Sequence, residues 1–119
     1  MLILVVDDDQ DIAGLIAAFA RKVGWAANVA ASGKDALAYL NEVSPDLVIS
    51  DFNMPGMTGI ELLQAIKRNP SYKGIPFVLT TAGTDIDESG ARRAGCDGFL
   101  AKPFSLRVFR ELLGRFVPR

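Results

Sequence analysis

Residues 2–23, LILVVDDDQDIAGLIAAFARKV, contain the two patterns on which the fold prediction depends. Leu2–Val6 is a continuous apolar run rich in branched side chains, which indicates a strand buried on both faces, as in a parallel sheet covered by helices. After an acidic turn, apolar residues recur at helical spacing and predict one face of an amphipathic helix: Ile12, Leu15, Ile16, Phe19, Ala20 and Val23. Gly24 is suited to end that helix.

The rest of the chain repeats this alternation of short apolar runs and helical segments. Four more runs predict strands at residues 27–30, 47–49, 77–79 and 99–101. Capping patterns open helices at Ser32 with Asp35 and at Thr58 with Glu61. Ser105 can cap a last helix with an apolar face made by Leu106, Phe109, Leu112, Leu113 and Phe116. A helix within residues 85–94 should be marginal, because this segment contains Ser89-Gly90 and few apolar residues. The alternation predicts right-handed βαβ units in a doubly wound α/β domain.

Composition excludes several classes of protein. The chain has 119 residues, the usual length of one domain, so we expect residues 1–119 to form a single domain. With 13 Lys and Arg against 14 Asp and Glu, the net charge of −1 argues against direct binding of nucleic acid or an anionic membrane. The chain has no His, and its single Cys96 excludes a disulfide framework or a Cys-rich zinc site. The N-terminal apolar run is too short for a signal peptide or a membrane span, so we expect a cytoplasmic location without membrane insertion.

Polar side chains follow four of the five predicted strands. They are Asp7 and Asp8 after the first strand, Asp51 and Asn53 after the third, Thr81 after the fourth and Lys102 after the fifth. Ligands of open α/β sheets bind outside the carboxyl ends of the strands, where these side chains should meet. Clustered carboxylates repel one another, and Mg²⁺ would relieve this with its preference for oxygen ligands. A metal, a lysine and a hydroxyl around one carboxylate suit phosphoryl transfer, in which Asp is a known covalent acceptor.

Each of these residues also has an ordinary structural interpretation. The acids at residues 7–9 could form a solvated turn that caps the first helix, and Asp51 could initiate a loop. Thr81 could satisfy a strand end, and Lys102 could be an exposed loop residue. Their joint placement at successive strand ends favours the functional interpretation.

Four blocks of sequence resemble the receiver domain of two-component response regulators. They are residues 5–9 (VVDDD), 45–59 (PDLVISDFNMPGMTG), 79–82 (LTTA) and 98–104 (GFLAKPF), which together extend over essentially the whole chain. The resemblance implies a flavodoxin-like fold, a five-stranded parallel sheet in the order 2-1-3-4-5. It also implies a phosphorylation-controlled signalling switch rather than an enzyme, one that catalyses only its own phosphorylation and dephosphorylation.

The resemblance also implies a role for each matching residue. Asp51 would accept a phosphoryl group from a phosphohistidine of a sensor histidine kinase or a histidine phosphotransfer protein. Asp8, Asp51 and the backbone carbonyl of Asn53 would bind Mg²⁺, for which Mn²⁺ can substitute, and Asp7 would act through water. Lys102, in an expected cis bond to Pro103, would pair with the phosphoryl group, and Thr81 would hydrogen-bond to it. Phe99 would swing inward together with Thr81.

The signal is expected to leave through one face of the domain. This face would be formed by residues 85–94, the fifth strand and the last helix, where a downstream target could bind. Three positions depart from the common pattern of the family. Phe99 lacks a phenolic hydroxyl, Gly83 lacks a side chain that could cover the phosphoryl group, and Gly90 lies inside an expected helix.

Two other functions compete with this interpretation. A haloacid-dehalogenase-like phosphohydrolase would use Asp7 and Asp9 with Thr81 and Lys102, but it leaves Asp51 without a role. A receiver that is never phosphorylated and serves only for docking is the second alternative, although every residue of the acceptor site is present. Turnover of a small phosphate ester would favour the hydrolase.

Overall fold

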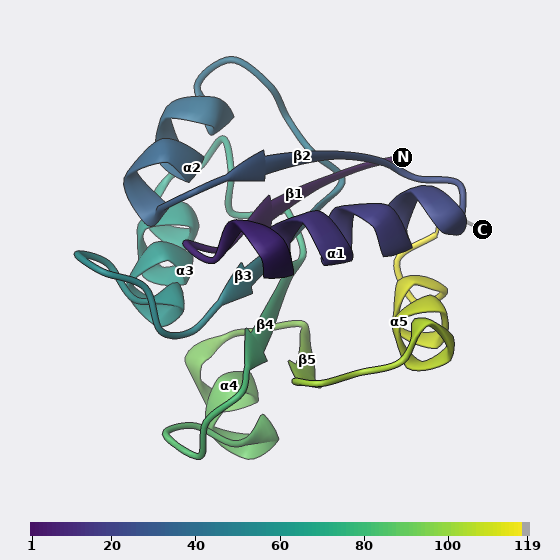
Figure 1. Cartoon of the computed structure of the whole chain (residues 1–119). Coiled ribbons are helices and arrows are strands. Elements are labelled where there is room, and N and C mark those ends of the chain that lie inside the picture. The colour runs from purple at the N-terminus through teal and green to yellow at the C-terminus, as the bar shows by residue number, and fades with distance from the viewer. Residues whose placement is uncertain (118–119) are drawn as a thin grey trace.

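The computed structural model describes residues 1–117 and contains one parallel sheet (Figure 1). Its strands are β1 (Leu2–Val6), β2 (Ala26–Ala30), β3 (Leu47–Asp51), β4 (Phe77–Thr81) and β5 (Gly98–Ala101). They lie in the order β2-β1-β3-β4-β5, and every neighbouring pair is parallel. The predicted doubly wound α/β fold and its strand order are therefore confirmed.

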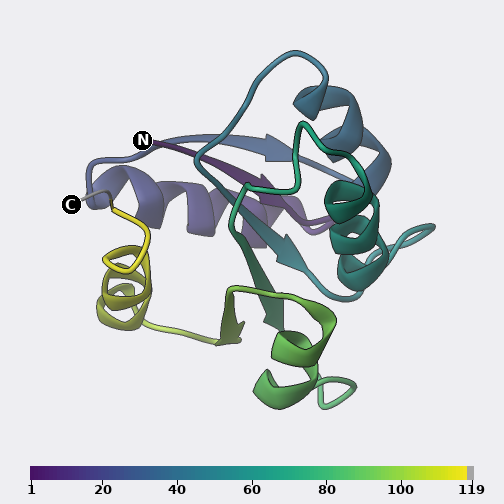
Figure 2. The same ribbon diagram turned by 180° about the vertical axis from the view of Figure 1, so that it is seen from behind.

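Helices cover both faces of the sheet (Figures 1 and 2). They are α1 (Gln10–Lys22), α2 (Gly33–Leu40), α3 (Gly59–Arg68), α4 (Glu88–Ala94) and α5 (Leu106–Leu113). Alternate residues of β1 supply two separate cores, Ile3 and Val5 on the side of α1 and α5, and Leu4 and Val6 on the side of α2, α3 and α4. All four of these side chains are fully buried, as expected for a parallel strand that is apolar on both faces.

Side-chain caps begin the helices where the sequence predicted them. Thr58 and Glu61 form the complete capping box of α3, each side chain accepting a hydrogen bond from the other residue's backbone N–H. Ser105 accepts a hydrogen bond from the N–H of Val108 at the start of α5. Gly24 follows the end of α1 with φ of +91°, a left-handed conformation that favours glycine.

The structure differs from the sequence prediction in the buried face of α1. Leu15 was expected to face the core, but it is 51% exposed. The buried residues of the helix are Ala13, Ile16, Ala17 and Ala20. Three of these four are alanines, so the helix packs closely against the sheet. The buried stripe therefore includes Ala13 and Ala17 and leaves out Leu15, which the spacing of the larger side chains had placed in it.

Two further predicted elements have different limits in the structure. β3 and β4 each extend two residues beyond their apolar runs, to Asp51 and Thr81, and these polar end residues are buried. α4 begins only at Glu88, is capped by Asp87 and has seven residues, in agreement with the expectation of a marginal helix. Within residues 1–117, no helix is both long and apolar enough to cross a membrane.

Candidate functional site

The carboxyl ends of four strands meet at one edge of the sheet and place the predicted site residues there. Asp51 and Thr81 are the last residues of β3 and β4, and Asp7 and Lys102 directly follow β1 and β5. The parallel register aligns these strand ends, because Asp51 is paired with Thr80 across β3 and β4. Four side chains that are far apart in the sequence are thus held by the most buried part of the fold.

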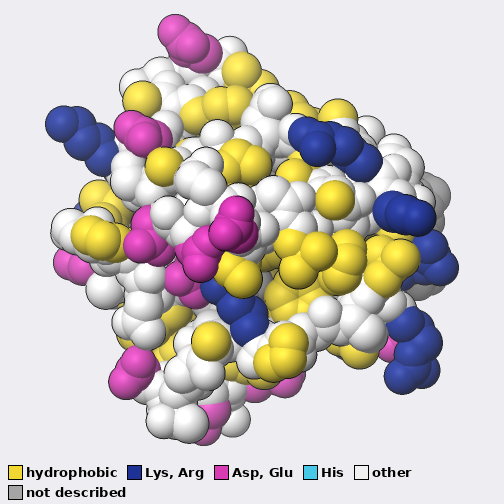
Figure 3. All heavy atoms as spheres, viewed as in Figure 1, with side chains coloured by type: hydrophobic (Ala, Val, Ile, Leu, Met, Phe, Trp, Pro, Cys, Tyr) yellow, Lys and Arg dark blue, Asp and Glu magenta, His cyan; other side chains and the backbone are white. Residues whose placement is uncertain are grey.

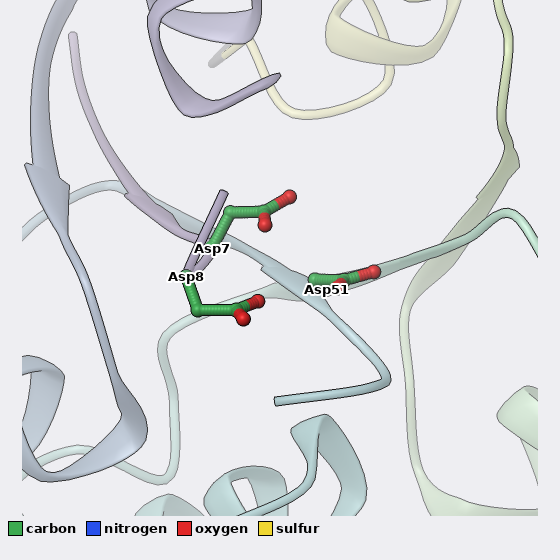
Figure 4. A group of neighbouring side chains, drawn as sticks. All are labelled: Asp7, Asp8 and Asp51. Atoms are coloured by element: carbon green, nitrogen blue, oxygen red, sulfur yellow. The ribbon is translucent and has the colours of Figure 1, made fainter. Parts of the chain in front are cut away.

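Three carboxylates form an acidic cluster at this edge (Figure 4). One carboxylate oxygen from each of Asp7, Asp8 and Asp51 lies within 4.8 Å of the others. Asp7 is buried, Asp51 is 9% exposed and Asp8 is exposed. The cluster is therefore fixed on its inner side by the sheet and reached from solvent on its outer side.

Lys102 joins two of these carboxylates. Its ammonium donates hydrogen bonds to Oδ2 of Asp7 at 3.0 Å and to Oδ1 of Asp51 at 3.1 Å. The backbone N–H of Lys102 bonds to the carbonyl of Thr81 at 2.8 Å, and the following peptide bond to Pro103 is cis, as expected. One positive charge thus faces three carboxylates, which leaves the site with a net negative charge that favours a cation.

Burial and charge act in opposite directions on the two central groups. Burial raises the pKa of Asp51 above its ordinary value of 3.8, with a smaller contribution from the charge of Asp7, and the ammonium of Lys102 opposes both. Burial lowers the pKa of Lys102, but its hydrogen bonds to Asp7 and Asp51 outweigh burial and leave its pKa above 10.5. The lysine therefore stays charged at neutral pH.

The raised pKa of Asp51 predicts a dependence of stability on pH. A group whose pKa is higher in the folded state contributes its stability below the unfolded value, and this contribution is lost as pH rises through the folded value. Ionised Asp51 should therefore lower the free energy of unfolding at pH 7, and Asp51→Asn should be more stable than the wild type there. Urea unfolding from pH 7 downward should show the difference shrinking as pH approaches 3.8. A constant difference, or a less stable variant at pH 7, would contradict this.

Asn53 lies on the exposed rim of the site, whereas Thr81, at the end of β4, is buried. The hydroxyl of Thr81 accepts a hydrogen bond from the N–H of Gly83 at 3.1 Å, so its own proton is free to be donated. The side-chain amide of Asn53 donates to Oδ2 of Asp85 at 3.2 Å. Asp85 was not predicted as a site residue. Its one signal in the sequence is that an acid stands four residues after Thr81, between Gly83 and Gly90.

Asp9 and Phe99 lie apart from the acidic cluster. The carboxylate of Asp9 caps α1 by accepting hydrogen bonds from the N–H groups of Asp11 and Ile12, as the structural interpretation of the acidic turn predicted. The hydrolase alternative needs Asp9 in the site, so this contact weighs against it. Phe99 is half-buried and lines a cavity of about 120 Å³ between α4 and α5, with Arg92 and Val108 among its neighbours.

The donor set fits a hard divalent cation. Three carboxylates with one exposed member suit Mg²⁺, which prefers oxygen ligands and keeps several waters. A softer metal would need nitrogen or sulfur ligands. The chain has no His, and Cys96 is buried in the core beneath α3 and α4, where burial raises the pKa of its thiol to about 11.

Comparisons with known proteins agree on one family. Residues 3–113 match the response regulator receiver domain. The chain is 35% identical to the chemotaxis protein CheY of Pseudomonas aeruginosa, covering 100% of this chain and 98% of that protein. It is 37% identical to the DNA-binding response regulator MtrA of Mycolicibacterium paratuberculosis, covering 95% of this chain and 48% of that relative. The chain therefore spans about half the length of MtrA.

Solved structures show the same similarity. The chemotaxis response regulator CheY4 of Vibrio cholerae superposes with a TM-score of 0.87 at 32% identity, covering 98% of both chains. The receiver domain of the sensor histidine kinase PA1611 from Pseudomonas aeruginosa, which has a magnesium ion coordinated in its active-site cleft, superposes with a TM-score of 0.87 at 25% identity. That match covers 97% of this chain and 95% of that one.

Proposed function

This chain belongs to the response regulator receiver family and is a phosphorylation-controlled switch of two-component signalling, and we propose that Asp51 is the residue that accepts the phosphoryl group. One observation carries the assignment. Asp51 is the carboxylate that both contacts Lys102 and lies in the acidic cluster at the end of the central sheet while remaining partly exposed. We further propose that residues 1–119 act as one receiver domain.

The chain's own residues can account for the transfer. An Oδ atom of Asp51 forms a bond to phosphorus while the P–N bond of the phosphohistidine breaks, and the electron pair of that bond returns to the imidazole. Lys102 faces the developing negative charge, and the free proton of Thr81 is available to a phosphoryl oxygen. Mg²⁺ bound by Asp8, Asp51 and the carbonyl of Asn53, with Asp7 acting through water, would neutralise the remaining charge.

The partners follow from the family and from composition. Receiver domains interact with sensor histidine kinases, and these 119 residues contain no His, so the donor histidine lies outside them. We propose a kinase or a histidine phosphotransfer protein as the donor. Near-balanced charge supports protein partners rather than direct contact with DNA. The cytoplasmic location stays a prediction, as does the limitation of catalysis to the domain's own phosphorylation and dephosphorylation.

Phosphorylation by a small donor tests the assignment of function. Incubated with acetyl phosphate and Mg²⁺, the protein should gain the mass of one phosphoryl group, and chelation of the metal should prevent this gain. Intact-mass spectrometry is the measurement. A chain that gains no phosphoryl group from acetyl phosphate or from any phosphorylated histidine donor would instead be a docking receiver.

The same geometry predicts how the signal leaves the site. In the phosphorylated form, a phosphoryl group with about −1.5 to −2 units of charge replaces the single negative charge of the Asp51 carboxylate. If Thr81 turns toward that charge, it gives up its hydrogen bond from Gly83 and vacates space next to β5. Phe99 can then turn inward, since burying a phenyl side chain stabilises by up to about 3 kcal/mol. The output face, defined as α4, β5 and α5, should change with it.

Amide NMR with and without beryllofluoride, a phosphoryl mimic, measures this change. We expect shifts throughout residues 83–101. Because Phe99 has no hydroxyl to desolvate, its inward rotamer should be partly populated before the mimic is added. Shifts confined to Asp51 and Lys102 would show that the domain signals through another face.

A further inference from the structure

A hydrogen bond between two side chains joins two loops beside the site. The amide of Asn53, in the loop after β3, donates a hydrogen bond to Oδ2 of Asp85, in the loop after β4. These residues follow Asp51 by two positions and Thr81 by four, so the bond connects the loop after the acceptor carboxylate to the loop after the neighbouring strand β4. Both residues are exposed, which places the bond on the solvent side of the site.

The absence of a side chain at Gly83 leaves room for the carboxylate of Asp85. A Cβ atom placed on Gly83 would lie 3.3 Å from Oδ2 of Asp85 and 3.8 Å from Oγ1 of Thr81. A side chain at position 83 would therefore begin in close contact with the carboxylate of Asp85 and beside the hydroxyl of Thr81. Gly83 has no side chain to cover the phosphoryl group, and Asp85 supplies a side chain in the same part of the loop.

We propose that Asp85 is a positioning residue that lengthens the lifetime of the phosphorylated form by holding the Asn53 side chain across the solvent side of the site. This inference rests on the proposed function, because it presupposes that Asp51 carries the phosphoryl group. Asp85 acts through Asn53 and needs no contact with the phosphoryl group itself.

Hydrolysis of the phosphorylated form requires water to reach phosphorus. The water oxygen forms a bond to phosphorus while the P–O bond to Asp51 breaks, and the electron pair of that bond returns to the carboxylate. One proton of the water stays on the departing phosphate and the other passes to solvent. A bridge between the two loops restricts the approach of that water, so breaking the bridge should speed the reaction.

The test compares Asp85→Ala, Asp85→Asn and a matched control, Glu42→Ala. Glu42 is an exposed acid in the segment after α2, and its removal changes the net charge as Asp85→Ala does. Each protein is phosphorylated with acetyl phosphate and Mg²⁺, separated from the donor and followed by intact mass. Asp85→Ala should lose its phosphoryl group about fivefold faster than the wild type, the factor that corresponds to the net value of one hydrogen bond.

The conservative variant separates the hydrogen bond from the charge. The side-chain carbonyl of asparagine at position 85 can still accept from Asn53, so Asp85→Asn should keep the wild-type lifetime, as should Glu42→Ala. Without phosphate, the Asn53 side-chain amide resonances should shift in Asp85→Ala and stay in place in the control.

Three results would overturn the inference. A wild-type lifetime in Asp85→Ala would show that the bridge does not protect the phosphoryl group. Equally fast loss in Asp85→Asn and Asp85→Ala would assign the effect to charge instead. A wild-type chain that takes up no phosphoryl group would overturn the proposed function and this inference together, which distinguishes it from the first two results.

Discussion

Asp51→Asn should abolish phosphorylation by acetyl phosphate. An amide oxygen is not a nucleophile, and the substitution retains the shape of the side chain, so the loss should be chemical rather than structural. The expected result is no gain of phosphoryl mass under conditions in which the wild type is fully modified. Urea unfolding should show that the variant is folded and at least as stable as the wild type, because burial raises the pKa of the Asp51 carboxyl that the variant lacks.

Asp11→Asn is the matched control for this variant. Asp11 is an exposed acid in the first turn of α1, and the change removes one negative charge near the site without removing a member of the acidic cluster. The control should be phosphorylated like the wild type. Phosphoryl mass on Asp51→Asn would show that another residue is the acceptor.

Asp8→Ala should weaken Mg²⁺ binding by at least about tenfold, since even the loss of an outer partner of a metal ligand costs a metal site about that much. Asp8 is the exposed member of the acidic cluster. Without it, the two remaining carboxylates, Asp7 and Asp51, are both paired with Lys102. Mn²⁺ should show the same loss. The wild-type affinity for Mg²⁺ should itself be weak without a phosphoryl group, because Lys102 already neutralises part of the negative charge of the carboxylates.

Titration followed by NMR or calorimetry measures this affinity. Trp25 is unsuited as a fluorescent reporter, because it precedes β2 at the opposite end of the sheet and is buried in the core beneath α1. Asp11→Ala serves as the control and should bind like the wild type. Equal binding by Asp8→Ala and the wild type would remove Asp8 from the site.

Strand ends were the most predictable feature of this molecule. A buried parallel strand must be apolar on both faces, so the polar residues that follow each apolar run mark the edge where ligands bind. That reasoning located Asp7, Asp51, Thr81 and Lys102, and the structure brings all four to one edge. It placed the strand ends two residues early at β3 and β4, because polar side chains that are buried look like loop residues in a sequence.

Contacts between loops were less predictable. The bond from Asn53 to Asp85 joins residues 32 positions apart, and no periodicity relates them. Leu15 was assigned to the core because it is large and correctly spaced, yet the close approach of α1 to the sheet selects its alanines instead. Hydrophobic spacing predicts that a helix packs against a core, whereas the depth of packing depends on side-chain sizes on both partners.

The position of the phosphoryl group tests the central claim most directly. Borohydride reduction of the phosphorylated wild-type chain converts an aspartyl phosphate into homoserine, which peptide sequencing by mass spectrometry can locate. The conversion is expected at Asp51 alone. Conversion at Asp7, Asp8 or Asp9, with Asp51 unmodified, would contradict the assignment. It would favour the hydrolase alternative, which uses the acids that follow β1.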